Sequence, residues 1–315
     1  MSMRSRGTSN VGAIVDPCTG WGKLNLVGSD KGSRDSATSR SESSSESRPT
    51  KRGPVTARRR PNTARAPNKA MPRDRRGLAP EDYLAHALQA KTAAARANWA
   101  QRGLAHRGSL EPTTKAMLLR QLYLAFYASG HFQKAYEIAL QMVGLGVLED
   151  VVQQDCARAI HAAGDIDLAV GHLRLAARQA PASRRAFHWW TLGSLLFLAG
   201  RHPDAIAAFS RAARWGTRDK PLYRGHLALA KLGAGIQIRG ISQLIVKLAD
   251  CPAGQGYGRF VLGHLAYHAD RWDDARAYLT RFVERTARGH AAMAMALRGE
   301  VEMARATLAS MQKAS

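Results

Sequence analysis

The sequence contains little cysteine and no long apolar run. Its three cysteines, Cys18, Cys156 and Cys251, lie far apart and form no Cys-x-x-Cys pair, which argues against a zinc site and against a disulfide framework. The apolar stretch at residues 11–15 is shorter than the ~7–15 residues of a secretory signal. No stretch approaches the ~18–20 apolar residues that span a bilayer. We therefore expect a soluble protein of the reducing cytoplasm, without a transmembrane segment.

Acidic residues and catalytic motifs are also scarce. The chain has 24 Asp+Glu against 47 Lys+Arg, for a net charge of +23. It contains no Gly-x-Ser-x-Gly or His-Glu-x-x-His motif and no kinase-like set of motifs. We therefore expect a protein that is not an enzyme and that has no catalytic residues, no cofactor and no bound metal.

Two patterns suggest ligands, and each has a simpler interpretation. The run Gly254-Gln-Gly256-Tyr-Gly258 lacks the spacing of a phosphate-binding loop, so it is better interpreted as a loop between repeats. His264 and His268 are four residues apart on an expected helix and could hold zinc if a third ligand came from elsewhere. The simpler interpretation places both histidines on a solvated helix face.

The first 77 residues differ in composition from the rest. Residues 1–76 contain 17 Lys+Arg and 6 Asp+Glu, with few large apolar side chains. Such a segment buries too little apolar surface to offset the entropy of ordering. Residues 1–77 are therefore expected to be a disordered, basic, Ser/Arg-rich segment that could bind nucleic acid or anionic lipid through charge. The alternative is that this segment is not translated and that the protein starts near Met71.

A short turn recurs along the remaining chain. The turns are centred on Gly130, Gly164, Gly200, Gly235, Asp270 and Gly299, at successive spacings of 34, 36, 35, 35 and 29 residues. A small residue lies five positions after each turn, at Ala135, Ala169, Ala205, Gly240, Ala275 and Ala304. Apolar residues recur at helical spacing on both sides of each turn, and no alternating strand pattern is present. The pattern predicts an all-α protein of repeated helix-turn-helix units.

These units resemble the tetratricopeptide-repeat (TPR) family. The best match combines Trp189, Leu192, Gly193, Gly200, Ala205, Phe209 and Ala212, with Pro181 closing the unit before it. A second match combines Leu262, Gly263, Ala275 and Leu279. The resemblance implies a right-handed α-solenoid of about six TPR-like units over residues 112–315. Residues 78–111 would form a capping helix, over residues 81–103, and a loop. Related helical-repeat families remain open alternatives.

The TPR resemblance also implies where a ligand would bind. In TPR proteins, set positions of the first helix in each unit line a concave groove for a peptide. The positions that match here are Arg120, Tyr127, Gln154, Arg158, His161, Trp190, Ser194, Tyr257, His264 and Tyr267. Arginines can clamp carboxylates and aromatics supply apolar contact area, so the groove suits a peptide that bears acidic residues. The alternative for Trp190 is packing against a neighbouring repeat.

The sequence thus predicts a non-catalytic scaffold or adaptor that binds a protein or peptide ligand. It departs from the Lys and Asn pattern of the chaperone-binding two-carboxylate clamp, so a chaperone tail is not the expected ligand. The alternative function is a regulatory protein that associates with nucleic acid or an anionic membrane through its basic residues. The oligomeric state does not follow from the sequence.

Overall fold

The computed structural model describes residues 78–289 and 291–314. The predictions for residues 1–77, including those for Cys18 and Met71, lie outside the described residues. Within the described residues the secondary structure is helical and contains no strand, so the all-α prediction is confirmed. The helices are α1 (Pro80–Gln89), α2 (Ala93–Leu104), α3 (Pro112–Ala128), α4 (Phe132–Val143), α5 (Glu149–Ala162), α6 (Ile166–Gln179), α7 (Ala182–Leu198), α8 (His202–Trp215), α9 (Lys220–Gly233), α10 (Ile241–Ala249), α11 (Gly258–Tyr267), α12 (Trp272–Ala287), α13 (Ala291–Ala296) and α14 (Arg298–Ala314), with a short 3₁₀ helix at Pro252–Gly254.

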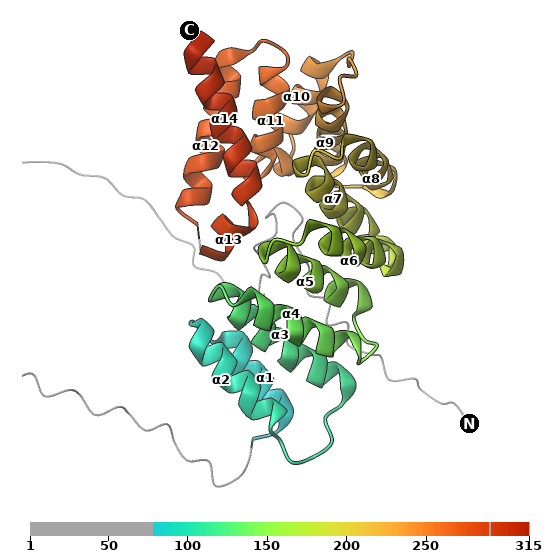
Figure 1. The fold of residues 1–315 in the computed structure, drawn as a ribbon, viewed down its shortest axis with the longest axis vertical. Coiled ribbons are helices and arrows are strands. Elements are labelled where there is room, and N and C mark those ends of the chain that lie inside the picture. The colour runs from blue at the N-terminus through green and yellow to red at the C-terminus, as the bar shows by residue number, and fades with distance from the viewer. Residues whose placement is uncertain (1–77, 290, 315) are drawn as a thin grey trace, which may run out of the picture. The chain divides into compact units, whose positions relative to one another are not determined.

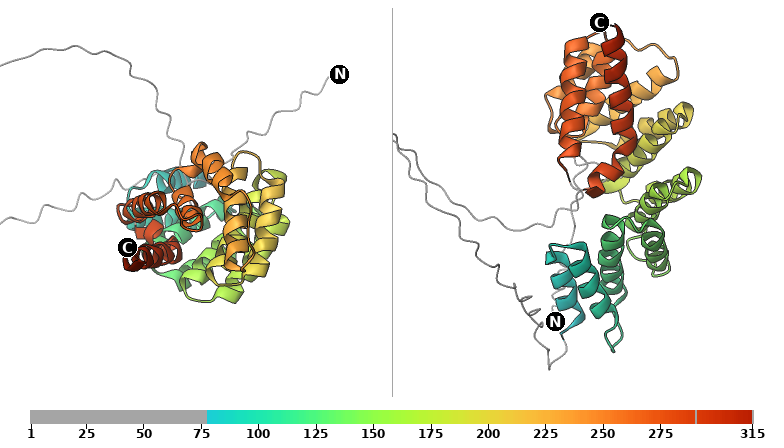
Figure 2. Two further views of the ribbon diagram at one scale, coloured as in Figure 1. Left: turned by 90° about the horizontal axis from the view of Figure 1, so that it is seen from above. Right: turned by 60° about the vertical axis from the view of Figure 1, so that its left-hand side comes forward.

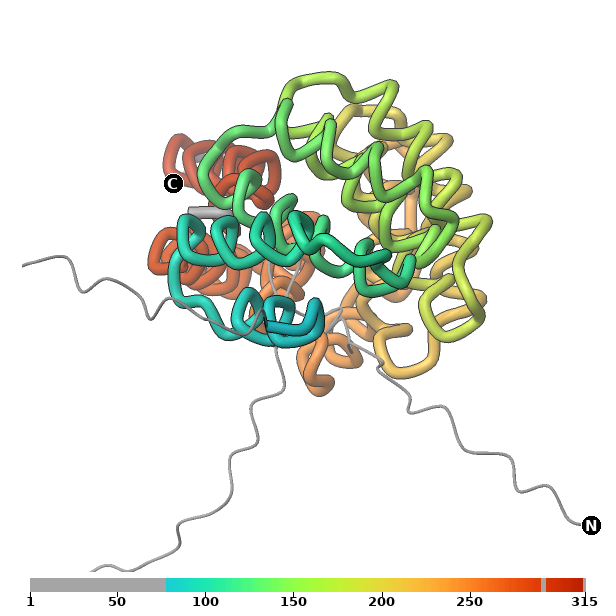
Figure 3. The backbone as a smooth tube through the Cα atoms, turned by 90° about the horizontal axis from the view of Figure 1, so that it is seen from below, coloured from blue at the N-terminus to red at the C-terminus, as the bar shows by residue number. Residues whose placement is uncertain are grey.

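Helices that follow one another in the chain also pack against one another. Each helix from α1 to α11 contacts the next, and α14 packs mainly on α12 and also contacts α11 (Figure 1). The helix axes change direction along the chain, so that the axes of α11, α12 and α14 lie at a steep angle to those of α5 and α6 (Figure 2). The short helix α13 contacts its neighbours α12 and α14 and also contacts α3 and α5, which lie far from it in the sequence (Figure 3).

The predicted hairpin turns are present at five of the six positions. Gly130, Gly164, Gly200, Gly235 and Asp270 all have positive φ, at 76°, 103°, 73°, 76° and 55°. Each lies between two antiparallel helices, where the chain must reverse and glycine accepts a left-handed conformation without steric cost. The sixth prediction was wrong: Gly299 lies inside the first turn of α14 rather than in a hairpin turn.

The small residues lie where the two helices of a hairpin meet. Ala205 and Ala275 are both 0 % exposed. In the first of these hairpins, a Cβ added to Gly193 would come within 2.6 Å of Phe209, and in the other a Cβ on Gly263 would come within 2.5 Å of Leu279. Each glycine therefore admits a large side chain from the paired helix, in the same register in both hairpins.

Gly240 does not follow this pattern. In the repeat pattern it stands at the position that an alanine occupies in the other units. In the structure it precedes α10, has a φ of 76° and is exposed. The loop between α9 and α10 is therefore longer than the other hairpin turns, and α10 is short.

The N-terminal capping element consists of two helices, whereas the sequence predicted one helix over residues 81–103. The chain leaves the helical conformation at Ala90, and Thr92 then caps α2 by accepting a hydrogen bond from the backbone N–H of Ala95 at 3.1 Å. The threonine side chain satisfies a free N–H at the start of the new helix, which favours a break over a continuous helix. In the described part of the chain, no helix has the length and apolarity needed to cross a membrane.

Candidate functional site

The predicted groove residues of the N-terminal half lie on α3 and α5, and the structure brings two of them together. Arg120 and Arg158 both face the buried carboxylate of Asp155, with Arg120 Nε 2.7 Å from Oδ2 and Arg158 Nη1 3.6 Å from Oδ1. Tyr127 stacks on Tyr123 with a centroid distance of 6.0 Å. The two guanidiniums proposed to clamp a ligand carboxylate thus already have an acidic partner in their own chain.

The remaining two residues of this group, Gln154 and His161, lie on α5. Gln154 is buried on α5. His161 is half-buried near the end of the same helix, and burial lowers the pKa of its imidazole.

The predicted groove residues of the C-terminal half gather around α14. Trp190 is 0 % exposed and lies edge-to-face with Tyr257, with a centroid distance of 5.3 Å. The Tyr257 hydroxyl donates a hydrogen bond to the buried carboxyl of Glu300 on α14, at 3.2 Å. Ser194 is buried beside them and its hydroxyl donates to the carbonyl of Trp190.

His264 and Tyr267 also contact α14. His264 Nδ1 lies 3.5 Å from the Thr307 hydroxyl, and the Ser310 hydroxyl lies 3.5 Å from the hydroxyl of Tyr267. Burial, with a smaller contribution from His268, lowers the pKa of His264 to about 3. His264 is only 2 % exposed, so its expected position on a solvated helix face was wrong. Within the described residues, no three potential metal ligands (His, Cys, Asp or Glu) gather closely enough to hold an ion.

Sequence reasoning did not identify the acidic partners of these clusters. Asp155 lies 35 residues from Arg120, and Glu300 lies 43 residues from Tyr257. A further buried carboxylate, Asp150 at the start of α5, accepts two hydrogen bonds from Arg184, at 2.7 and 2.8 Å. The pairs made with Arg120, Tyr257 and Arg184 join residues far apart in the sequence, so no local signal could have revealed them. Asp155 and Arg158, in contrast, lie three residues apart on α5, which is a spacing that the sequence does show.

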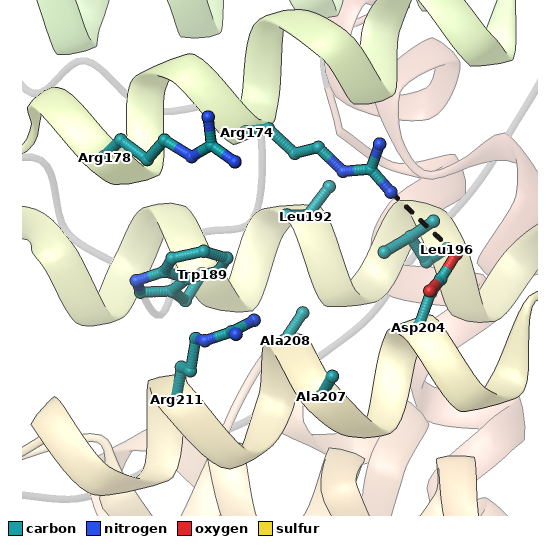
Figure 4. A pocket seen from close by; sticks show the side chains of 9 residues that line it. All are labelled: Arg174, Arg178, Trp189, Leu192, Leu196, Asp204, Ala207, Ala208 and Arg211. Carbon is teal, nitrogen blue, oxygen red and sulfur yellow. Dashed lines mark ion pairs between the residues drawn. The ribbon is translucent and has the colours of Figure 1, made fainter.

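A different region presents an open cavity. It has a volume of about 310 Å³ and lies over α7, between α6 and α8. Its lining residues are Arg174 and Arg178 on α6, Trp189, Leu192 and Leu196 on α7, and Asp204, Ala207, Ala208 and Arg211 on α8. Figure 4 shows α7 forming the floor, with the arginines reaching in from the helices on both sides. We call this cavity the arginine groove.

The arginine groove carries excess positive charge. Its only acidic lining residue is Asp204, which is held by Arg201 at 2.9 Å and lies 3.9 Å from Arg174. The contact with Arg174 is long and both side chains are about half exposed, so it contributes little. Arg178 and Arg211 have no carboxylate within salt-bridge distance among the described residues. Two guanidiniums are thus free to bind an anionic group.

The floor of the groove combines an indole with aliphatic side chains. The Arg211 guanidinium stacks over the Trp189 ring, with its central carbon 4.7 Å from the ring centroid. A guanidinium held flat on an aromatic face keeps its N–H groups pointing outward, where they can donate to a carboxylate in two parallel bonds. Sequence analysis used Trp189 only as a TPR-pattern residue. The signal that it missed was the pair of exposed arginines four residues apart on α6, next to that tryptophan.

The comparisons with known families and with curated sequences yield no match. Neither a model of a known protein family nor the sequence of a curated protein is significantly similar to the chain.

Proposed function

We propose that this chain is a non-catalytic scaffold or adaptor that binds an acidic segment of a partner protein in the arginine groove. In this proposal the helical pairs form a right-handed, TPR-like α-solenoid of about six units. The close approach of Gly193 to Phe209 and of Gly263 to Leu279, in the same register, supports a repeated unit. The sequential packing of α3 to α12 supports their stacking into an array.

The observation that carries the proposal is the chemistry of the groove. Three arginines surround an apolar floor of Trp189, Leu192 and Leu196, with a single carboxylate among them. An acidic side chain next to an apolar one would satisfy both parts of such a groove: charge-assisted hydrogen bonds at the rim and buried apolar area at the floor. Guanidinium groups stay protonated at neutral pH and so do not act as acid or base. The groove chemistry therefore favours binding over catalysis.

The ten residues predicted from the TPR resemblance remain a separate hypothesis. Eight of them are buried in the folded chain, and a ligand would have to displace contacts such as that between Arg120 and Asp155. The arginine groove needs no such rearrangement, which is why we propose it as the site. A cytoplasmic partner remains the expectation from the sequence.

The test compares the full chain with a variant that carries Arg178→Gln and Arg211→Gln. Both are immobilised and exposed to native lysate at low and high salt, with and without nuclease, and bound proteins are identified by mass spectrometry. Arg305→Gln is the matched control, because it removes one exposed arginine from α14, outside the groove.

We expect a set of proteins with acidic segments that the wild type and Arg305→Gln retain at high salt and that the double variant loses. If all three baits retain the same proteins, the groove is not the site. If the bound material is lost with nuclease from every bait alike, the nucleic-acid alternative through the basic residues replaces the proposal.

A further inference from the structure

A second arginine–tryptophan pair lies next to the arginine groove. Trp215, the last residue of α8, is 45 % exposed although it is a large aromatic side chain. The Arg185 guanidinium lies over its ring at 5.0 Å from the centroid, and that of Arg214 lies at 6.0 Å. An exposed tryptophan covered by cations is a contact surface rather than part of the core.

The two pairs are related by the geometry of the α7–α8 hairpin. Arg185 and Trp189 are four residues apart on α7, and Arg211 and Trp215 are four residues apart on α8. Because the helices are antiparallel, Trp189 faces Arg211 while Arg185 faces Trp215. Four residues of helix correspond to about 6 Å, so the Trp189–Arg211 and Arg185–Trp215 pairs lie about 6 Å apart along one surface.

The Arg185–Trp215 pair is held in place by hydrogen bonds of Arg185. Arg185 donates from Nε and from Nη2 to the carbonyl of Ala180, at 3.3 and 3.1 Å, in the link between α6 and α7. These bonds use one edge of the guanidinium and leave the remaining N–H groups of Arg185 for a ligand. No carboxylate lies within salt-bridge distance of Arg185 or Arg214 among the described residues.

We infer that the arginine groove continues to Trp215 and that its ligand is an extended segment with acidic residues two positions apart. This inference rests on the proposed function. In an extended chain every second side chain points to the same face, about 6.7 Å from the next. That repeat is close to the spacing of about 6 Å between the two arginine–tryptophan pairs. An apolar residue two positions earlier would then lie in the groove near Trp189 and Ala207, which are the more exposed of its apolar lining residues.

The dimensions of the groove favour an extended segment over a helix. The cavity of about 310 Å³ is bounded on one side by α6 and on the other by α8. A ligand helix is about 10 Å wide with its side chains, so even one turn of it is bulkier than this cavity, whereas an extended segment is narrower.

Two labelled peptides of identical composition test the spacing. In one, the core Leu-Ser-Glu-Ser-Glu places the leucine and both acids on one face of an extended chain. In the other, Leu-Glu-Glu-Ser-Ser, only one acid shares the face of the leucine. Binding to the full chain is measured by fluorescence anisotropy for the wild type, for Arg185→Gln with Arg214→Gln, and for Arg305→Gln as control. Far-UV circular dichroism checks that each variant is folded.

We expect the wild type and Arg305→Gln to bind the first peptide about 5-fold more tightly than the second, which is the scale of one exposed charge contact. In the double variant this preference should disappear. Arg214→Gln alone, which alters no backbone contact, should reduce it in the same direction.

Equal affinity for the two peptides in the wild type, no binding of either, or an undiminished preference in the double variant would overturn the inference. A labelled single-stranded oligouridylate that binds more tightly than either peptide, and that loses affinity in the double variant, would overturn it in favour of nucleic acid. Trp189→Ala separates the two proposals. If it weakens both peptides equally and the spacing preference is absent, the groove is the site but does not extend to Trp215.

Discussion

Replacement of Glu300 by glutamine should make the stability of the protein less sensitive to pH. Glu300 lies in the first turn of α14, is 2 % exposed, and accepts a hydrogen bond from the Tyr257 hydroxyl at 3.2 Å. Burial raises the pKa of its carboxyl to about 7, because desolvation outweighs the backbone and Tyr257 hydrogen bonds that favour the charged form. The folded state therefore holds a proton that the unfolded chain releases near its ordinary pKa of 4.5.

The size and sign of the effect follow from this pKa difference. Because the folded pKa is raised, stability is fully present below pH 4.5 and is lost as the pH rises toward 7. Each pKa unit corresponds to about 1.4 kcal/mol, so ionisation costs about 3 kcal/mol at pH 8 and below about 1 kcal/mol at pH 5. Glutamine does not titrate and can still accept from Tyr257. Any change in unfolding free energy caused by the amide group itself is the same at pH 5 and at pH 8.

We therefore expect the difference in unfolding free energy between Glu300→Gln and the wild type to rise by about 2.5 kcal/mol from pH 5 to pH 8, in favour of the variant. Urea unfolding followed by far-UV circular dichroism at several pH values measures it. Other titrating groups, such as His226 and His264, are present in both proteins and cancel in the difference.

Glu302→Gln is the matched control for this prediction. Glu302 lies two residues later on the same helix, with a side chain that is 61 % exposed and paired to Arg298 at 2.8 Å. Loss of such an exposed pair should change stability by less than about 1 kcal/mol. If Glu300→Gln and Glu302→Gln showed the same pH dependence, Glu300 would be ionised in the folded state as readily as in water, and the argument from burial would fail.

Two further predictions concern packing and buried charge. Asp150→Asn should cost about 3 kcal/mol, because it leaves the buried His188 and the half-buried Arg184 without their carboxylate, and urea unfolding at neutral pH measures the loss. Retention of full stability would show that water replaces the carboxylate. Ala205→Leu should cost about 1–3 kcal/mol by overpacking the contact between α7 and α8, whereas Ser210→Leu on the exposed face of α8 should cost less than about 0.5 kcal/mol. Equal melting temperatures for these two variants would contradict the hairpin register.

The sequence predicted the repeated hairpins because each hairpin has strong local requirements. A reversal between two helices needs a residue that tolerates positive φ, and Gly130 and Gly200 have it, at 76° and 73°. The prediction of a hairpin turn failed at Gly299, where the repeat spacing is shorter. Gly299 follows Asp270 by only 29 residues, and the chain forms α13 before it and a helix through it.

The candidate site could not be predicted in the same way. A helical pattern identifies which residues share a face, but it does not say which residue of another helix will cover them. Trp190 and Tyr257 occupy predicted groove positions, yet they pack against each other, and the Tyr257 hydroxyl donates to Glu300. The arginine groove depends on the lateral distance between α6 and α8, which is set by the packing of both helices on α7. That distance has no signature in the sequence of any one helix.

The packing of the α7–α8 hairpin and the geometry of the proposed site depend on the same register. Gly193 and Phe209 set how closely the two helices approach on the buried side. On the exposed side, the same alignment places Trp189 opposite Arg211. A sliding of one helix by a single turn would separate the indole from its guanidinium by about 5.4 Å. Substitutions that overpack the buried side should therefore weaken ligand binding without touching the groove, whereas substitutions of the exposed arginines should weaken binding and leave stability unchanged.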